Sequence, residues 1–248
     1  MKKLTYIILS AAILAFAASC VKEDHAKNQK VTYYPVFNVV GGATYAHQVG
    51  TTWADPGISA TVNGEDITDK LVIDDTVDGS TSGVYTVKYS YTNEDGFENH
   101  VVRTVVVYDI ANASTVDISG DYTTVTCVTY NAAGVAVRDW NSFLGNFNYT
   151  LPIQAGPAKG LFYVSDLMAG FYWKFYNGGY GSSYAFKAFI LLNADNSISL
   201  LNGDDIDPWG DPIFLKAGGA TGYNPVSGDV TIDWNYGGAS HYVTIYKK

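Results

Sequence analysis

The chain has 248 residues, of which 15% are aromatic and only 16% are charged. Its formal net charge is −9, and it becomes −11 once the two lysines of residues 1–19, a segment without acidic residues, are removed. This charge argues against nucleic acid as a partner, because nucleic acid is bound by neutralising its phosphates with Lys and Arg. The many Tyr, Phe and Trp residues, together with 25 Gly, favour strands joined by tight turns. We therefore expect an all-β protein.

Residues 1–19 are predicted to be a signal peptide, because a charged start precedes an apolar run over 7–18 that is too short to span a bilayer. Cys20 follows directly after small residues. This arrangement resembles the lipobox of bacterial lipoproteins, in which the cysteine is acylated and becomes the first mature residue. Ala17 stands where the usual lipobox has Leu, as in the looser lipoboxes of Bacteroidetes-type lipoproteins. The alternative is a plain secretory signal that happens to include a cysteine.

The lipobox resemblance implies a protein held on the outer membrane at the cell surface by acyl chains on Cys20, since two or more chains anchor stably. Residues 20–32 have no hydrophobic period and are expected to form a flexible tether. Within them, residues 22–24 resemble a short acidic surface-export signal, although a solvated charge cluster looks the same. Acylation leaves Cys127 without a partner, and its strand-like surroundings predict a small buried hydrophobe rather than a nucleophile.

Residues 33–110 carry the signals of a β-sandwich domain. A short strand is expected at 58–62, between a Pro-Gly turn and an Asn-Gly turn. A hairpin is expected over 84–108, turning at 93–96. Roughly seven short strands in this length fit a sandwich.

Several motifs in this domain resemble the bacterial Ig-like repeat of surface proteins, which usually acts as a spacer. They are Trp53–Ala60, Asn63–Thr68, Gly83–Tyr89, Asp95–Phe97 and Arg103–Val107. We expect Asp55 and Asp66 to cap turns, with Ca²⁺ ligation as the alternative. Asp75-Thr76-Val77 resembles an O-glycosylation sequon of secreted proteins in this bacterial group, so Thr76 is a candidate for modification.

Residues 111–248 are expected to form a larger antiparallel β-sandwich or barrel-like domain. Alternation and turn signals predict strands at 122–130, 147–153, 160–164, 184–192, 197–201, 230–234 and 242–246. Ser165 could cap a single helical turn that ends near Gly170.

Four motifs in this region resemble the C-terminal β-domain that accompanies the Ig-like repeat in Bacteroidetes surface lipoproteins. They are Ser119–Tyr122, Tyr163–Leu167, Trp209–Gly210 and Tyr223–Trp234. The resemblance implies a connection with polysaccharide-utilisation systems, and so with the glycan-uptake proteins of the outer membrane as partners. It carries no activity onto individual residues.

The sequence lacks the usual signatures of hydrolases, nucleotide-binding loops and zinc sites. The four histidines are far apart in sequence, and we expect them to be surface or core residues rather than catalytic. One loop is densely acidic, with Asp204, Asp205, Asp207 and Asp211. We interpret this loop first as a turn. The second interpretation is a Ca²⁺ site, with calcium as the one candidate cofactor, and the third is the acid pair of a glycosidase.

Residues 171–189 hold nine aromatic side chains in 19 positions, around a Gly-rich loop centred on Tyr180. We expect Phe175, Phe186 and Phe189 to be core residues. Exposed Tyr and Trp suit sugars, because they combine a flat apolar face with a polar tip. The candidate ligand-binding residues are Tyr172, Trp173, Tyr176, Tyr180 and Trp209.

The sequence thus favours a non-enzymatic surface lipoprotein that binds glycan, or supports polysaccharide capture, with the Ig-like domain as spacer. The alternative is an adhesion or surface-assembly protein whose aromatic residues contact another protein. A glycan hydrolase is the third hypothesis.

Overall fold

The computed structural model describes residues 30–143, 145, 150–201, 210, 213–236 and 240–248. Residues 30–34 belong to an N-terminal unit and form neither strand nor helix, whereas residues 35–248 form a second unit. Most regular elements of the second unit are strands, which confirms the all-β prediction. Among the described residues, no helix has the length and apolar character needed to cross a membrane.

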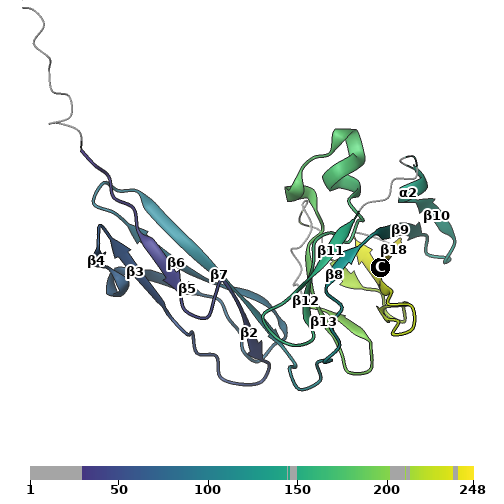
Figure 1. Ribbon diagram of the computed structural model, residues 1–248, viewed down its shortest axis with the longest axis horizontal. Helices are drawn as coiled ribbons and strands as arrows, with labels where there is room; N and C mark the ends of the chain where they lie inside the picture. Colours follow the sequence, from purple (N-terminus) through teal and green to yellow (C-terminus); the bar gives the residue numbers. More distant parts are fainter. Residues whose placement is uncertain (1–29, 144, 146–149, 202–209, 211–212, 237–239) are drawn as a thin grey trace, which may run out of the picture. The chain divides into compact units, whose positions relative to one another are not determined.

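Residues 36–108 form the two sheets of the Ig-like domain (Figure 1). The first sheet has the order β1 (Val36–Val39), β3 (Ile58–Val62), β4 (Glu65–Asp66). The second has the order β2 (Thr44–Gln48), β7 (Glu98–Tyr108), β6 (Gly83–Thr92), β5 (Val72–Asp75), and a short helix, η2 (Thr68–Lys70), precedes β5. β2 and β7 pair in parallel, and the other pairs are antiparallel. The strand at 58–62 and the β6–β7 hairpin lie where alternation and turn residues predicted them.

A buried arginine organises the Ig-like core. Arg103 is fully buried, and its Nη2 donates hydrogen bonds to the carbonyl oxygens of Val40 and Gly57 at 2.8 and 2.7 Å. Its Nε lies 3.5 Å from Asp55 Oδ1, and the Tyr89 hydroxyl donates to Asp55 Oδ2 at 2.7 Å. The amide N–H of Gly57 also donates to Asp55 Oδ1, at 3.2 Å. Asp55 therefore caps its turn as predicted and, in addition, neutralises a buried cation.

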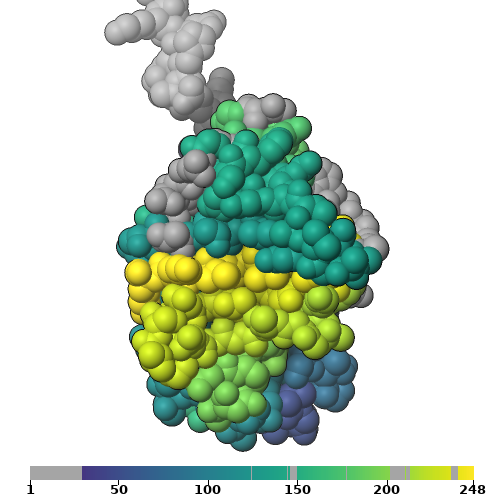
Figure 2. Space-filling model, turned by 90° about the vertical axis from the view of Figure 1, so that its right-hand side faces the viewer, coloured from purple at the N-terminus to yellow at the C-terminus, as the bar shows by residue number. Residues whose placement is uncertain are grey.

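The larger domain consists of two antiparallel sheets. One has the order β14 (Ile198–Leu200), β13 (Ala188–Leu192), β12 (Leu161–Val164), β11 (Leu151–Ala155), β8 (Gly120–Tyr122). The other has the order β10 (Ala136–Asp139), β9 (Thr124–Tyr130), β18 (His241–Lys247), β17 (Val230–Tyr236), β15 (Ile213–Leu215), with β16 (Gly222–Tyr223) beside β17. In Figure 2 the teal of β10 and β9 borders the yellow of β18 and β17. Short helices accompany the strands: α2 (Trp140–Phe143), η3 (Phe171–Phe175), η4 (Tyr176–Gly178) and η5 (Ser182–Tyr184).

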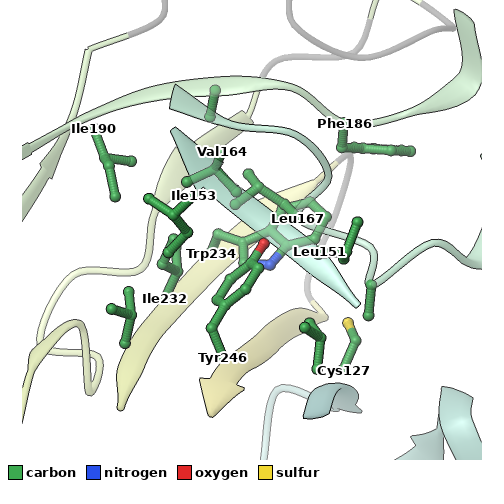
Figure 3. Close-up of a cluster of buried hydrophobic side chains, with 14 of the residues drawn as sticks. Cys127, Leu151, Ile153, Val164, Leu167, Phe186, Ile190, Ile232, Trp234 and Tyr246 are labelled. Carbon is green, nitrogen blue, oxygen red and sulfur yellow. The ribbon is translucent and has the colours of Figure 1, made fainter. Parts of the chain in front are cut away.

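Trp234 lies in the core between these sheets, among apolar side chains from both (Figure 3). The indole is fully buried, and its Nε1 donates a hydrogen bond to the Thr244 hydroxyl at 3.1 Å. That hydroxyl donates in turn to the carbonyl oxygen of Leu167 at 2.5 Å. Cys127 is buried in the same cluster, and burial raises the pKa of its thiol to about 12. The prediction of a small buried hydrophobe at this position is confirmed.

Candidate functional site: an aromatic cavity

The segment that joins β12 to β13, residues 165–187, forms turns and short helices rather than strand. Its two ends meet at the side chain of Asp166. Oδ1 accepts hydrogen bonds from the N–H groups of Met168 and Phe186 at 2.9 and 3.0 Å, and Oδ2 accepts one from Gly170 at 2.9 Å. Burial raises the pKa of the Asp166 carboxyl to about 6, and the three N–H donors oppose that rise. Asp166, rather than the predicted Ser165, caps this turn.

Gly179 lets the segment fold back on itself. Its φ is +86°, and a Cβ at this position would lie 2.8 Å from the carbonyl oxygen of Trp173. Beyond this glycine, the N–H of Tyr180 donates to the carbonyl oxygen of Tyr172 at 3.0 Å. The rings of these two tyrosines stack, with centroids 6.5 Å apart and planes inclined by 13°.

The folded segment faces β10 and α2 across an open cavity of about 470 Å³, hereafter the aromatic cavity. The lining residues that the structure describes are aromatic apart from one arginine: Arg138, Trp140, Phe143, Phe171, Tyr172, Tyr176, Tyr180 and Tyr184. The rings support one another, since Trp140 packs on Phe171 with centroids 4.2 Å apart. The Trp140 indole is also fixed by a 2.7 Å hydrogen bond to the Thr129 hydroxyl. A ligand would therefore meet rings that are already in position.

The cavity combines ring faces with polar groups. Tyr180 and Phe143 are exposed by 41% and 57%, so both rings are accessible from solvent. Burial raises the pKa of the Tyr172 hydroxyl, and the neighbouring Tyr176 and Tyr180 act in the same direction. The Tyr172 hydroxyl is therefore neutral at physiological pH, where it can both donate and accept a hydrogen bond.

Three of the five predicted ligand-binding residues come together in this cavity: Tyr172, Tyr176 and Tyr180. Trp173 is half-buried and packs against the core, outside the cavity lining, with Lys174 Nζ 4.6 Å from its ring centroid. Trp209 lies outside the described residues, as do Cys20 and the acidic residues Asp204, Asp205, Asp207 and Asp211. A binding role for these positions stays a prediction.

The other five lining residues are absent from the prediction. Arg138, Trp140 and Phe143 come from β10 and α2, about thirty residues upstream of the aromatic segment. Their spacing, Arg-x-Trp-x-x-Phe, is a sequence signal that could have drawn attention to them. Phe171 and Tyr184 lie inside the aromatic stretch itself.

The remaining candidates have structural partners. Thr76 is exposed, and its hydroxyl donates to the carbonyl oxygen of Thr86 at 2.9 Å. Asp66 caps its turn by accepting the N–H of Thr68 at 2.8 Å. Within the described residues, no group of three or more His, Cys, Asp or Glu could hold a metal ion.

His241 is a buried histidine with partners on both ring nitrogens. Nδ1 lies 2.7 Å from Asp233 Oδ1, and Nε2 lies 3.0 Å from Lys216 Nζ. Because Lys216 can only donate, Nε2 is the acceptor and Nδ1 carries the proton. The ring also stacks on Tyr130, with centroids 5.2 Å apart. This agrees with the expectation of a satisfied core histidine.

Comparisons with known proteins match both halves of the chain. A family model described as a bacterial surface protein, Ig-like domain, matches residues 37–107. A second model, a BT2262-like C-terminal domain, matches residues 111–248. Among solved structures, the lipoprotein BT2262 from Bacteroides thetaiotaomicron is 30% identical over 87% of this chain and 100% of its own, with a TM-score of 0.43.

Two structures of ZmpB from Clostridium perfringens also match, at lower identity. The M60 catalytic domain with CBM51-1 and CBM51-2 is 17% identical over 68% of this chain and 15% of its own, with a TM-score of 0.29. The structure of CBM51-2 in complex with GlcNAc and INT domains is 14% identical. The match covers 86% of this chain and 43% of that chain, with a TM-score of 0.27. At these values neither structure bears on the fold or the ligand of this chain. No curated protein matches it.

Proposed function

The chain belongs to the family of BT2262-like proteins, with a bacterial surface Ig-like domain at its N-terminal side, and on that premise we propose that it is a surface lipoprotein that binds glycan. The relative at 30% identity is itself a lipoprotein. Cys20 would carry the acyl chains, residues 20–32 would form the tether, and the Ig-like domain would act as spacer. Glycan-uptake proteins of the outer membrane are the proposed partners in polysaccharide capture.

The aromatic cavity is the observation that carries the proposal. Its 470 Å³ falls within the size range typical of small-ligand sites. Sugars present apolar C–H faces with hydroxyl rims, and tyrosines match both features with a ring face and a hydroxyl. Four tyrosines are among the described lining residues, and the rings of two of them, Tyr172 and Tyr180, are nearly parallel.

Binding rather than catalysis suits the chemistry of this lining. Among the eight described lining residues there is no carboxylate, histidine, serine or cysteine. Glycoside hydrolysis commonly needs two carboxyl groups on either side of the scissile bond. Arginine, tyrosine, tryptophan and phenylalanine supply contacts, and that is what a binding site needs.

A matched pair of phenylalanines tests the site. Phe143 lines the cavity and is 57% exposed, whereas Phe214 is 49% exposed in the same domain but outside the lining. We expect Phe143→Ala to weaken binding of the best ligand from a polysaccharide panel about tenfold, the loss of roughly 1.4 kcal/mol of ring contact, and Phe214→Ala to leave it unchanged. Calorimetry measures both. Equal affinities in the two variants, or no binding by any polysaccharide, would contradict the proposal.

The anchor has its own test. Metabolic labelling with a palmitate analogue should mark the wild-type protein, and Cys20→Ser should abolish the label. An unlabelled wild-type protein would remove the anchor from the proposal while leaving the binding site untouched. If the cavity instead holds a protein in complexes purified from native membranes, the adhesion alternative takes its place.

A further inference from the structure

Arg138 is the one charged side chain among the described residues that line the aromatic cavity. It projects from β10, all of whose side chains are exposed. Its Cζ lies 4.7 Å from the centroid of Trp140 and 4.8 Å from that of Phe143. Contact with two aromatic rings stabilises a guanidinium group and holds it in place. The cation is therefore fixed at the wall of the cavity.

The hydrogen-bond donors of this guanidinium are available to a ligand. Aromatic rings offer it no oxygen acceptor, and the ion pairs of the described residues include none with Arg138. Arginine presents five N–H donors in a planar fork that matches a carboxylate, and the bidentate pair is stronger than a neutral hydrogen bond. In a chain of net charge −9, a cation that forms no ion pair within the described part of the chain, beside stacked tyrosines, suits an anionic ligand.

We propose that the aromatic cavity selects acidic glycans, pairing the carboxylate of a uronic or sialic acid with Arg138 while a sugar ring packs on the tyrosines. This inference rests on the proposed glycan-binding function and specifies its ligand. The rings supply affinity for sugar in general, and Arg138 distinguishes an acidic sugar from its neutral counterpart.

The test compares each acidic glycan with a partner that lacks only the charge. The probes are oligogalacturonate, a hyaluronan hexasaccharide and sialyllactose, each with its carboxyl-reduced form. For at least one pair we expect the wild-type protein to prefer the acidic member about tenfold or more, as a charge-assisted hydrogen bond allows. Arg138→Met should bind both members equally, and Arg138→Lys should keep part of the preference because it keeps the charge.

Lys174→Met is the matched control, because Lys174 also contacts an aromatic ring, that of Trp173, but lies outside the cavity lining. It should keep the full preference. Circular dichroism of each variant checks that it is folded. Equal binding of acidic and neutral members by the wild type, or an unchanged preference in Arg138→Met, would overturn the inference but leave the proposed function standing. Sulfated polysaccharides are included in the panel, and binding of these alone would show that the anion is a sulfate and refute the inferred carboxylate. No binding to any probe or polysaccharide would contradict both this inference and the proposed glycan-binding function.

Discussion

Replacing Asp166 with alanine removes the carboxylate that joins the two ends of the aromatic segment, and so measures its contribution to stability. The change leaves the N–H groups of Met168, Gly170 and Phe186 without their acceptor. Each buried N–H without a partner costs about 1–3 kcal/mol, and water entering the vacated space offsets part of the sum. We therefore expect Asp166→Ala to lower the free energy of unfolding by about 3 kcal/mol at pH 7, measured by urea unfolding.

The pH dependence of this decrease in the free energy of unfolding shows whether the buried carboxyl group of Asp166 is its cause. Its pKa of about 6 in the folded protein lies above the ordinary 3.8, so the folded state holds the proton more tightly than the unfolded state does. The resulting stabilisation is fully present below pH 3.8 and is lost as the pH rises through 6. Between pH 4 and pH 7 the wild type should lose roughly 2–3 kcal/mol from this group, and the variant should lose none of it.

The difference between wild type and Asp166→Ala should consequently be larger at pH 4 than at pH 7. Asp195→Ala is the control, because Asp195 accepts the N–H of Ser197 at 2.9 Å on the surface, and its hydrogen bonds with Ser197 lower the pKa of its carboxyl. Its effect should have the opposite pH dependence. A loss below about 1 kcal/mol for Asp166→Ala at pH 7, or the same loss at both pH values, would refute the reasoning.

Three further predictions concern other parts of the chain. Gly179→Ala should reduce thermal stability more than Gly178→Ala, because both residues have positive φ but only at Gly179 would a Cβ meet backbone atoms within 3 Å; equal melting temperatures would contradict this. Arg103→Met should cost about 3–5 kcal/mol in urea unfolding, since it leaves Asp55 without its buried counterion, and a loss below 1 kcal/mol would argue against it. In a Cys20→Ser chain, Cys127 should resist thiol reagents until the protein unfolds, because it is fully buried with a pKa of about 12; labelling of the native state would show that the burial is wrong.

The sequence predicted the sheets better than the segment that forms the cavity. Alternation and turn residues located the β6–β7 hairpin and strand β3, because β3 buries alternate side chains and β6 pairs with β7, its neighbour in sequence. The strand predicted to begin at Tyr184 begins instead at Ala188. The hydrogen bonds to Asp166 override the alternation there, and local pattern does not reveal such tertiary bonds.

The sequence predicted only one wall of the aromatic cavity, for a similar reason. Tyr172 and Tyr180 belong to a stretch whose aromatic density marks it, and a Gly-rich loop made exposure of Tyr180 a sound expectation. The opposite wall comes from β10 and α2, and its position depends on the pairing of β9 with β10 and the packing of Trp140 on Phe171. Such contacts join residues far apart in the chain, so composition within one window does not predict them.

The position of β18 in its sheet constrains how the larger domain is assembled. β18 pairs with β9 over seven positions, yet more than a hundred residues separate the two strands along the chain. Contacts between such distant segments form slowly, because a long loop must close first. The edge of β9 that pairs with β18 therefore stays unpaired until β18 has been synthesised, and over that interval it is open to pairing with another chain.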